Sequence, residues 1–218
     1  MSRLAIFIDG AYLDNLARNE CGGIGIDLEL LSQEVKGVIA ASTPEPIDLL
    51  RTLYYNCPPY QSNTPTPEER SRYAAFRRFA DALKSLRRFE FREGRLVYRG
   101  VDRDGRPIFQ QKRIDLLLGL DFALLSSKGQ ISHIALLAGD SDLIPAMQVA
   151  KQEGVSAWLF HGPRRSKAGG YSTYHQDLWQ EADERFELST DFLIRCQKVS
   201  TIMVSPASGE TLQDSPGH

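Results

Sequence analysis

The feature that most constrains the fold is a series of short apolar runs that stand between segments of helical length. The run "LAIFI" at residues 4–8 has no helical spacing, and "ISHIALLA" at 131–138 is apolar enough for burial on both faces. The run "VSAWLF" at 155–160 predicts a further strand. Strands buried on both faces are typical of parallel sheets that are covered by helices on each side. We therefore expect an α/β fold with right-handed crossovers.

The segments between these runs carry helix signals with defined ends. Asp27 is a candidate N-cap for a helix within residues 25–40, and Thr66 followed by Pro67 starts a helix within residues 66–89. The other expected elements are strands at 47–56 and 185–188, a strand and hairpin over 89–100 that turns near Glu93–Gly94, and helices near 113–129, 141–154, 172–183 and 190–198.

Size and composition predict one soluble domain. The chain has 218 residues, of which 42% are hydrophobic, enough for one well-buried core. We expect a single domain over residues 1–198 and a disordered tail over 199–218. The cysteines Cys21, Cys57 and Cys196 lack metal-type spacing and are expected to be reduced thiols. No segment has the features of a secretion signal or approaches the roughly 18–20 apolar residues that cross a bilayer. We expect a cytoplasmic protein with no membrane partner.

Positive charge is concentrated in one part of the chain. The formal net charge is −2, but residues 70–113 hold 14 of the 26 Lys and Arg residues against five acids. Such a local excess can steer a polyanion to one face of a molecule. A solvated helix face with charged hairpin edges explains the same pattern equally well.

Four aspartates are expected at one edge of the sheet. Asp9 ends the first strand, and Asp140 and Asp142 follow the strand at 131–138. Asp115 opens the helix that leads into that strand. The carboxyl ends of parallel strands form the functional crevice of such sheets. Crowded carboxylates repel one another and lose hydration unless a cation lies among them, and oxygen ligands favour Mg²⁺ or Mn²⁺ over zinc.

Each of these acids also has a purely structural explanation. Asp9 could cap the first helix, Asp140 and Asp142 could form a turn that caps the next, and Asp115 could complement a helix dipole. All four explanations hold together less often than any one of them does. Asp121 lies six residues beyond Asp115, which is roughly 240° around a helix and about 9 Å along it. We therefore expect Asp121 to act from an outer position or through water.

Three segments carry a family resemblance: "FIDGAYLDNL", "QKRIDLLLGLDFAL" and "IALLAGDSDLIPAMQVAKQEGVSAWLF". The order and spacing of their aspartates are similar to those of the NYN family, the LabA-like group of PIN-type nuclease domains. The later segment "YSTYHQDLWQEADERFEL" resembles the closing helix and strand of that family. The resemblance spans roughly residues 3–190.

The resemblance implies a PIN-like α/β fold, with a parallel sheet sandwiched between helices. It also implies a metal-dependent ribonuclease that uses Mg²⁺ or Mn²⁺. The residues at the metal positions are Asp9, Asp115, Asp140 and Asp142.

Three positions depart from the family pattern. Many relatives have an asparagine where this chain has Tyr12, a glycine where it has Arg113, and a serine where it has Ala138. The four acids are unchanged. Tyr12 could instead stack on a nucleobase.

The resulting hypothesis is hydrolysis of phosphodiester bonds in single-stranded RNA, whose exposed backbone can enter an acid-lined crevice with basic flanks. Lys112 and Arg113 would hold the flanking phosphates, and Ser141 would donate to a phosphate oxygen. Asp142 could accept the proton of the attacking water. RNA is the expected partner, and a homodimer or a protein partner is also open.

Alternative functions remain at this stage. A non-catalytic module could keep the fold and bind RNA or a protein through the basic segment. A haloacid dehalogenase-type phosphatase needs a second aspartate two residues after the first, where this chain has Ala11. The fragment "CGGIGID" does not follow a strand as a dinucleotide-binding loop requires.

Overall fold

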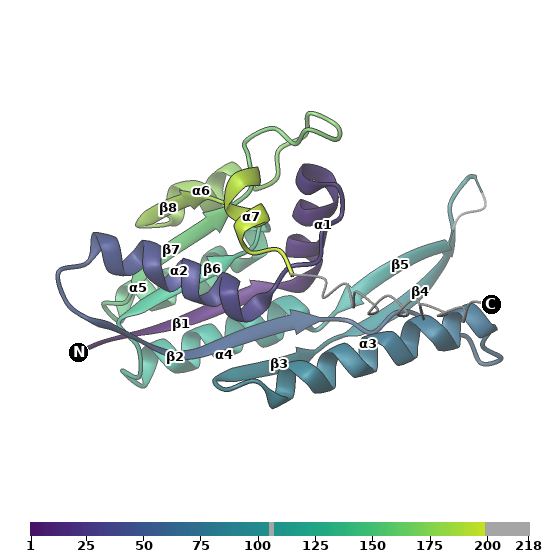
Figure 1. Cartoon of the computed structure of the whole chain (residues 1–218), viewed down its shortest axis with the longest axis horizontal. Coiled ribbons are helices and arrows are strands. Elements are labelled where there is room, and N and C mark those ends of the chain that lie inside the picture. Colours follow the sequence, from purple (N-terminus) through teal and green to yellow (C-terminus); the bar gives the residue numbers. More distant parts are fainter. Residues whose placement is uncertain (105–106, 199–218) are drawn as a thin grey trace, which may run out of the picture.

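A six-stranded parallel sheet forms the centre of the computed structural model, which describes residues 1–104 and 107–198 (Figure 1). Its strand order is β3-β2-β1-β6-β7-β8, and each neighbouring pair is parallel. The expected parallel α/β sheet is therefore confirmed, while the expected tail over 199–218 lies outside the described residues. The strands are β1 (Ser2–Asp9), β2 (Ile47–Asn56), β3 (Phe89–Glu93), β6 (His133–Leu137), β7 (Ser156–His161) and β8 (Glu184–Glu187).

Helices cover both faces of the sheet. One core packs against α1 (Gly10–Cys21), α2 (Leu28–Ser42), α3 (Pro67–Ser85) and α7 (Thr190–Arg195). The other packs against α4 (Ile114–Ser127), α5 (Ile144–Gln152) and α6 (Gln176–Glu181). Within β1, Ile6 and Ile8 enter the first core and Phe7 the second, all without exposed surface. Each such side chain contributes roughly 1.5–3 kcal/mol by its burial.

Local signals set several of these boundaries, as the sequence predicts. The carboxylate of Asp27 accepts the Leu30 N–H at 3.0 Å at the start of α2. Thr66 and Glu69 form a reciprocal capping box at the start of α3. The helix expected near 172–183 is confined to α6, because His175 is its N-cap. None of the helices among the described residues is long and apolar enough to cross a membrane.

The hairpin expected near Glu93–Gly94 is wrong. β3 ends at Glu93, in parallel pairing with β2. β4 (Arg95–Val101) pairs instead with β5 (Pro107–Lys112) in a separate antiparallel ribbon, which projects as an arm beside the N-terminal half of α3 (Figure 1). A Cβ at Gly94 would lie 2.6 Å from Cδ1 of Ile114. Gly94 therefore marks a tightly packed crossing at which the ribbon leaves the sheet, and not a turn.

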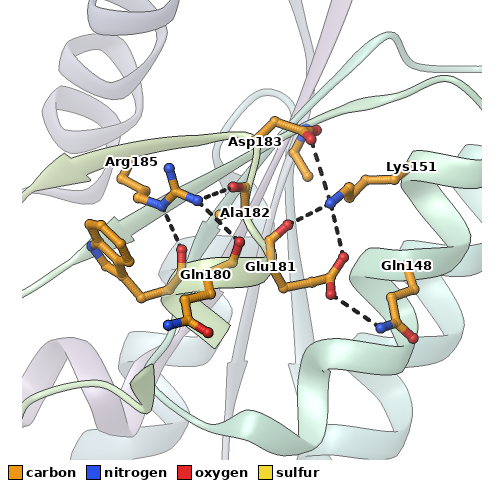
Figure 2. A network of polar contacts seen from close by, with 9 residues as sticks. Gln148, Lys151, Gln180, Glu181, Ala182, Asp183 and Arg185 are labelled. Atoms are coloured by element: carbon orange, nitrogen blue, oxygen red, sulfur yellow. Dashed lines mark hydrogen bonds and ion pairs between the residues drawn. The ribbon is translucent and has the colours of Figure 1, made fainter. Parts of the chain in front are cut away.

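A lysine-centred network connects α5 to the segment before β8 (Figure 2). Lys151 Nζ donates to the backbone oxygen of Glu181 at 2.7 Å and to its Oε1 at 2.9 Å. The same nitrogen lies 3.6 Å from Oδ1 of Asp183, and Gln148 Nε2 donates to Oε2 of Glu181 at 3.1 Å. Asp183 immediately precedes β8, so this acidic group lies at the amino edge of the sheet.

Candidate active site at the carboxyl edge of the sheet

Asp9 occupies the end of the central strand. β1 lies between β2 and β6, so successive connections leave it in opposite directions and create a topological switch point. The carboxylate of Asp9 accepts the N–H groups of Ala11 at 3.0 Å and Tyr12 at 3.2 Å, and so caps α1. The structural explanation for Asp9 is therefore correct, but it leaves a carboxylate at the centre of the carboxyl edge.

Asp140 and Asp142 follow the neighbouring strand, β6. Asp140 is the N-cap of the short 3₁₀ helix η1 (Ser141–Leu143), and its Oδ1 accepts the Asp142 N–H at 3.0 Å. The preceding Gly139 has no room for a side chain, since a Cβ there would lie 2.5 Å from the Thr173 backbone oxygen. This close packing fixes the turn that presents the two acids.

Asp115 reaches the site from the start of a helix, whereas Asp9 and Asp140 reach it from the ends of strands. It lies in the first turn of α4, next to the α4 N-cap Arg113, whose φ is 77°. This left-handed conformation favours glycine over a residue with a side chain. Asp115 and Asp142 line the same 390 Å³ groove between α4 and α5, together with Leu116 and Leu120.

Burial and repulsion from neighbouring carboxylates raise the pKa values of Asp9 and Asp115. The pKa of Asp9 is raised to about 6, chiefly by burial and to a lesser extent by Asp115 and Asp140, although the capping N–H groups of Tyr12 and Ala11 lower it. Burial also raises the pKa of Asp115, with added contributions from Asp140 and Asp142. The structure therefore brings four of the five predicted acids into electrostatic contact.

The chain supplies no cation to this group. Among the described residues, none of Asp9, Asp115, Asp140 and Asp142 forms an ion pair with Lys or Arg. Carboxylate oxygens suit a hard divalent ion such as Mg²⁺ or Mn²⁺. Across residues 1–104 and 107–198, however, no three His, Cys, Asp or Glu side chains are already spaced as the ligands of one ion. The donor chemistry fits a divalent cation, and binding one would require the side chains to move closer together.

Asp121 differs from the other four acids in its contacts, and the outer or water-mediated role expected for it stays a prediction. Its Oδ2 accepts a hydrogen bond from Tyr55 Oη at 2.9 Å and one from Arg92 Nε at 2.8 Å. Asp121 is thus neutralised by a cation from β3. We assign it the role of joining α4 to β2 and β3.

Tyr12 is packed beneath the crevice, and this placement favours a structural role over the expected base stacking. Its hydroxyl accepts the Gly162 N–H at 2.9 Å. A Cβ at Gly139 would lie 2.7 Å from the Tyr12 ring. The ring therefore holds the loops after β6 and β7 together.

The other predicted substrate residues lie at the rim. Lys112 ends β5 and Arg113 follows it, and both side chains are exposed. Ser141 lines an open crevice of 410 Å³ together with Asp140. These positions are compatible with phosphate contacts, which stay a prediction.

Sequence reasoning missed residues that tertiary structure brings to this edge. Thr173 and His175 line the same crevice as Asp140, and the His175 N–H donates to the Gly139 backbone oxygen at 2.8 Å. No local pattern marks this loop. Asn56, which helps to stabilise the charged form of the partly buried Asp14, ends β2 beside Asp9. The signal for Asn56 was available, because it is a polar residue at the end of a predicted strand.

Comparison with known proteins agrees with this geometry. No curated protein matches the chain significantly. The NYN domain family matches residues 3–177, which include β1, the segment from Lys112 to Asp121 and the Asp140–Asp142 turn. That family falls within the PIN-like nuclease superfamily, whereas the LabA-like subgroup stays a prediction. By this match and by its parallel sheet with acids at the carboxyl edge, the chain belongs to the NYN domain family.

Proposed function

We propose that the protein is a metal-dependent ribonuclease that hydrolyses phosphodiester bonds in single-stranded RNA. The observation that carries the proposal is a group of aspartates from three chain segments, in which burial and neighbouring carboxylates raise the pKa values of Asp9 and Asp115. Within the described residues, none of the four forms an ion pair with Lys or Arg. Folding such a group is unfavourable unless a ligand offsets the charge. The cytoplasmic location and the homodimer or protein partner stay predictions.

The residues of the chain divide the expected tasks. Asp9, Asp115, Asp140 and Asp142 would hold Mg²⁺ or Mn²⁺, with Asp9 and Asp140 kept in place by the helix caps that they form. When bound, the ion would supply charge stabilisation at the phosphate and orient a water molecule.

Substrate contacts fall to residues around these acids. Asp142 has an exposed side chain and could accept the proton of the water. Lys112 and Arg113 would neutralise phosphates on either side of the cleaved bond, and Ser141 would donate a hydrogen bond to a phosphate oxygen.

A cleavage assay tests the proposal. Unstructured RNA with Mn²⁺ should be cleaved by the wild type and at least about 100-fold more slowly by Asp140→Asn. Asparagine retains Oδ1, which accepts the Asp142 N–H, so the turn is preserved. Asp81→Asn is the matched control, because Asp81 is 69% exposed on α3 and should leave the rate unchanged. Intact RNA with the wild type, or equal cleavage by Asp140→Asn, would contradict the proposal.

A non-catalytic RNA-binding module is the second candidate. It is favoured by the lack of a preformed three-ligand group among the described residues. This candidate predicts that RNA is retained by the protein with equal affinity in Mn²⁺ and in EDTA, without cleavage in either.

A further inference from the structure

The β4–β5 ribbon connects directly to the candidate active site. It leaves the sheet at Gly94, and its second strand ends at Lys112, three residues before Asp115. Phe109 is three residues before Lys112, which places it roughly 10 Å along the strand from the rim of the site. A chain that leaves the crevice past Lys112 would therefore meet the ribbon within a few nucleotides.

Three aromatic rings form a cluster at the junction of this ribbon and the loop before α3. Tyr60 lies 5.8 Å from Tyr98 and 5.1 Å from Phe109, and the last two rings are 5.9 Å apart, all measured between ring centroids. Tyr98 is 45% exposed and Phe109 is 39% exposed. We refer to Tyr60, Tyr98 and Phe109 as the aromatic platform. The platform lies outside both cores of the main sheet and presents ring surface to solvent.

The platform lines a cleft that is large enough for a planar ligand. The cleft has a volume of 460 Å³ and includes Leu96 and Arg72 beside the three rings. Its acid, Glu69, is occupied by the α3 capping box and by Ser62, whose hydroxyl donates to it at 2.7 Å. The cleft therefore combines aromatic faces with the guanidinium of Arg72, which also contributes to the lowered pKa of Glu69.

The charges around the platform select a polyanion. Among the described residues, Arg72, Arg95, Arg99 and Lys112 form no ion pair with an acid, and the Arg99 guanidinium is held by Gln110 at 2.8–2.9 Å. In contrast, Arg77 on the same helix as Arg72 is paired with Glu93. Unpaired basic groups beside exposed rings are the combination that binds single-stranded nucleic acid, through phosphates and stacked bases.

We propose that the aromatic platform stacks unpaired nucleobases of single-stranded RNA and so holds the strand that extends from the carboxylate crevice. The inference rests on the proposed function for the identity of the strand, but its test does not need cleavage. Double-stranded RNA hides its bases and should not engage the rings.

Binding in EDTA separates this inference from catalysis. A fluorescently labelled, unstructured 20-mer RNA is titrated into the wild-type chain, and the dissociation constant is measured by anisotropy. The double variant Tyr98→Leu/Phe109→Leu keeps apolar bulk but loses two ring faces, so the affinity should fall by about tenfold or more. Tyr98→Phe/Phe109→Tyr keeps the rings and should bind as the wild type does. Ile194→Ala is the control for an exposed apolar residue elsewhere, since Ile194 is 49% exposed on α7.

The outcomes distinguish the two proposals. RNA affinity that depends on the rings supports the inference, whether or not Mn²⁺ permits cleavage in a parallel assay. Cleavage by the wild type combined with unchanged affinity of the leucine variant overturns the inference alone. Ring-dependent binding without cleavage contradicts the proposed function alone. A polyglutamate peptide or a duplex RNA that binds as tightly, with the same loss in the leucine variant, would overturn the inference, because neither offers unpaired bases.

Discussion

Two acidic groups at opposite edges of the sheet differ in whether a cationic side chain neutralises them. At the amino edge, Lys151 lies among Glu181 and Asp183, and hydrogen bonds from Lys151 and Gln148 hold the pKa of Glu181 below its ordinary value (Figure 2). The interaction with Glu181 raises the pKa of Lys151 in turn.

At the carboxyl edge no such cation is present among the described residues. There the pKa of Asp9 rises to about 6. The sequence can neutralise crowded acids with a lysine, as Glu181 and Asp183 show, and it does not do so around Asp9. The difference supports the proposal that the carboxyl-edge group binds a divalent cation, and the predictions below test that contrast.

The largest expected effect is stabilisation by metal. A divalent ion that binds the folded chain at 100 times its dissociation constant should raise the free energy of unfolding by about 2.7 kcal/mol. Urea unfolding with Mn²⁺ and with EDTA measures this difference. Asp115→Asn should lose most of it, whereas Lys151→Met, at the other edge, should retain it. Equal stabilisation by Mn²⁺ in the wild type and in Asp115→Asn would contradict the assignment of the carboxyl edge as the metal site.

The next effect concerns Asp9 in the absence of metal. A pKa of about 6 in the folded chain against 3.8 as the ordinary value corresponds to about 3 kcal/mol, which partial solvent access reduces to about 1–2 kcal/mol. The contribution of Asp9 to stability is present below pH 4 and is lost as the pH rises through 6. Asp9→Asn keeps an acceptor for the α1 cap and should therefore stabilise the chain in EDTA.

Urea unfolding at two pH values checks the sign of this prediction. The gain in Asp9→Asn should be clearly larger at pH 8 than at pH 5, since the wild-type carboxylate is only partly ionised at pH 5. A gain that is the same at both values, or a loss at pH 8, would show that Asp9 is not under electrostatic strain.

A smaller effect of opposite sign is expected at the amino edge. Lys151→Met should destabilise the chain by about 1 kcal/mol, because it leaves Glu181 and Asp183 without their cation at a partly exposed site. The lowered pKa of Glu181 contributes stability above its ordinary pKa that is lost on acidification. The variant should therefore lose less stability between pH 7 and pH 4 than the wild type. Lys84→Met, which breaks an exposed pair with Asp81, is the control and should change stability by less than about 0.5 kcal/mol.

The sequence predicts those parts of the molecule that depend on local pattern. The strand over residues 47–56 coincides with β2, and Asp27 and Thr66 cap the helices as expected, because these signals act within a few residues. The position of Asp9 and Asp140 at one edge follows from the geometry of parallel strands and needed no knowledge of the partner strands.

What the sequence could not supply depends on tertiary pairing. Nothing local to Gly94 distinguishes a turn from a packed crossing, so the β4–β5 pairing was missed. The pairing of Asp121 with Arg92 joins residues 29 apart in the chain. Thr173 reaches the crevice through a loop whose path is set by contacts with Gly139 and Gly162.

The smallest effect concerns Arg113, the basic residue nearest in sequence to Asp115. The left-handed backbone of Arg113 destabilises the folded chain by about 1 kcal/mol, and Arg113→Gly removes this cost. The greater conformational freedom of glycine in the unfolded chain lowers the stability of the variant by about 0.5 kcal/mol. The net gain should be about 0.5 kcal/mol, provided that the guanidinium does not neutralise the carboxylates. Arg88 has a similar φ of 65° but pairs with Asp48, so Arg88→Gly should destabilise. If Arg113→Gly also destabilised, Arg113 would be acting as the built-in cation of the carboxyl edge, and the contrast with Lys151 would disappear.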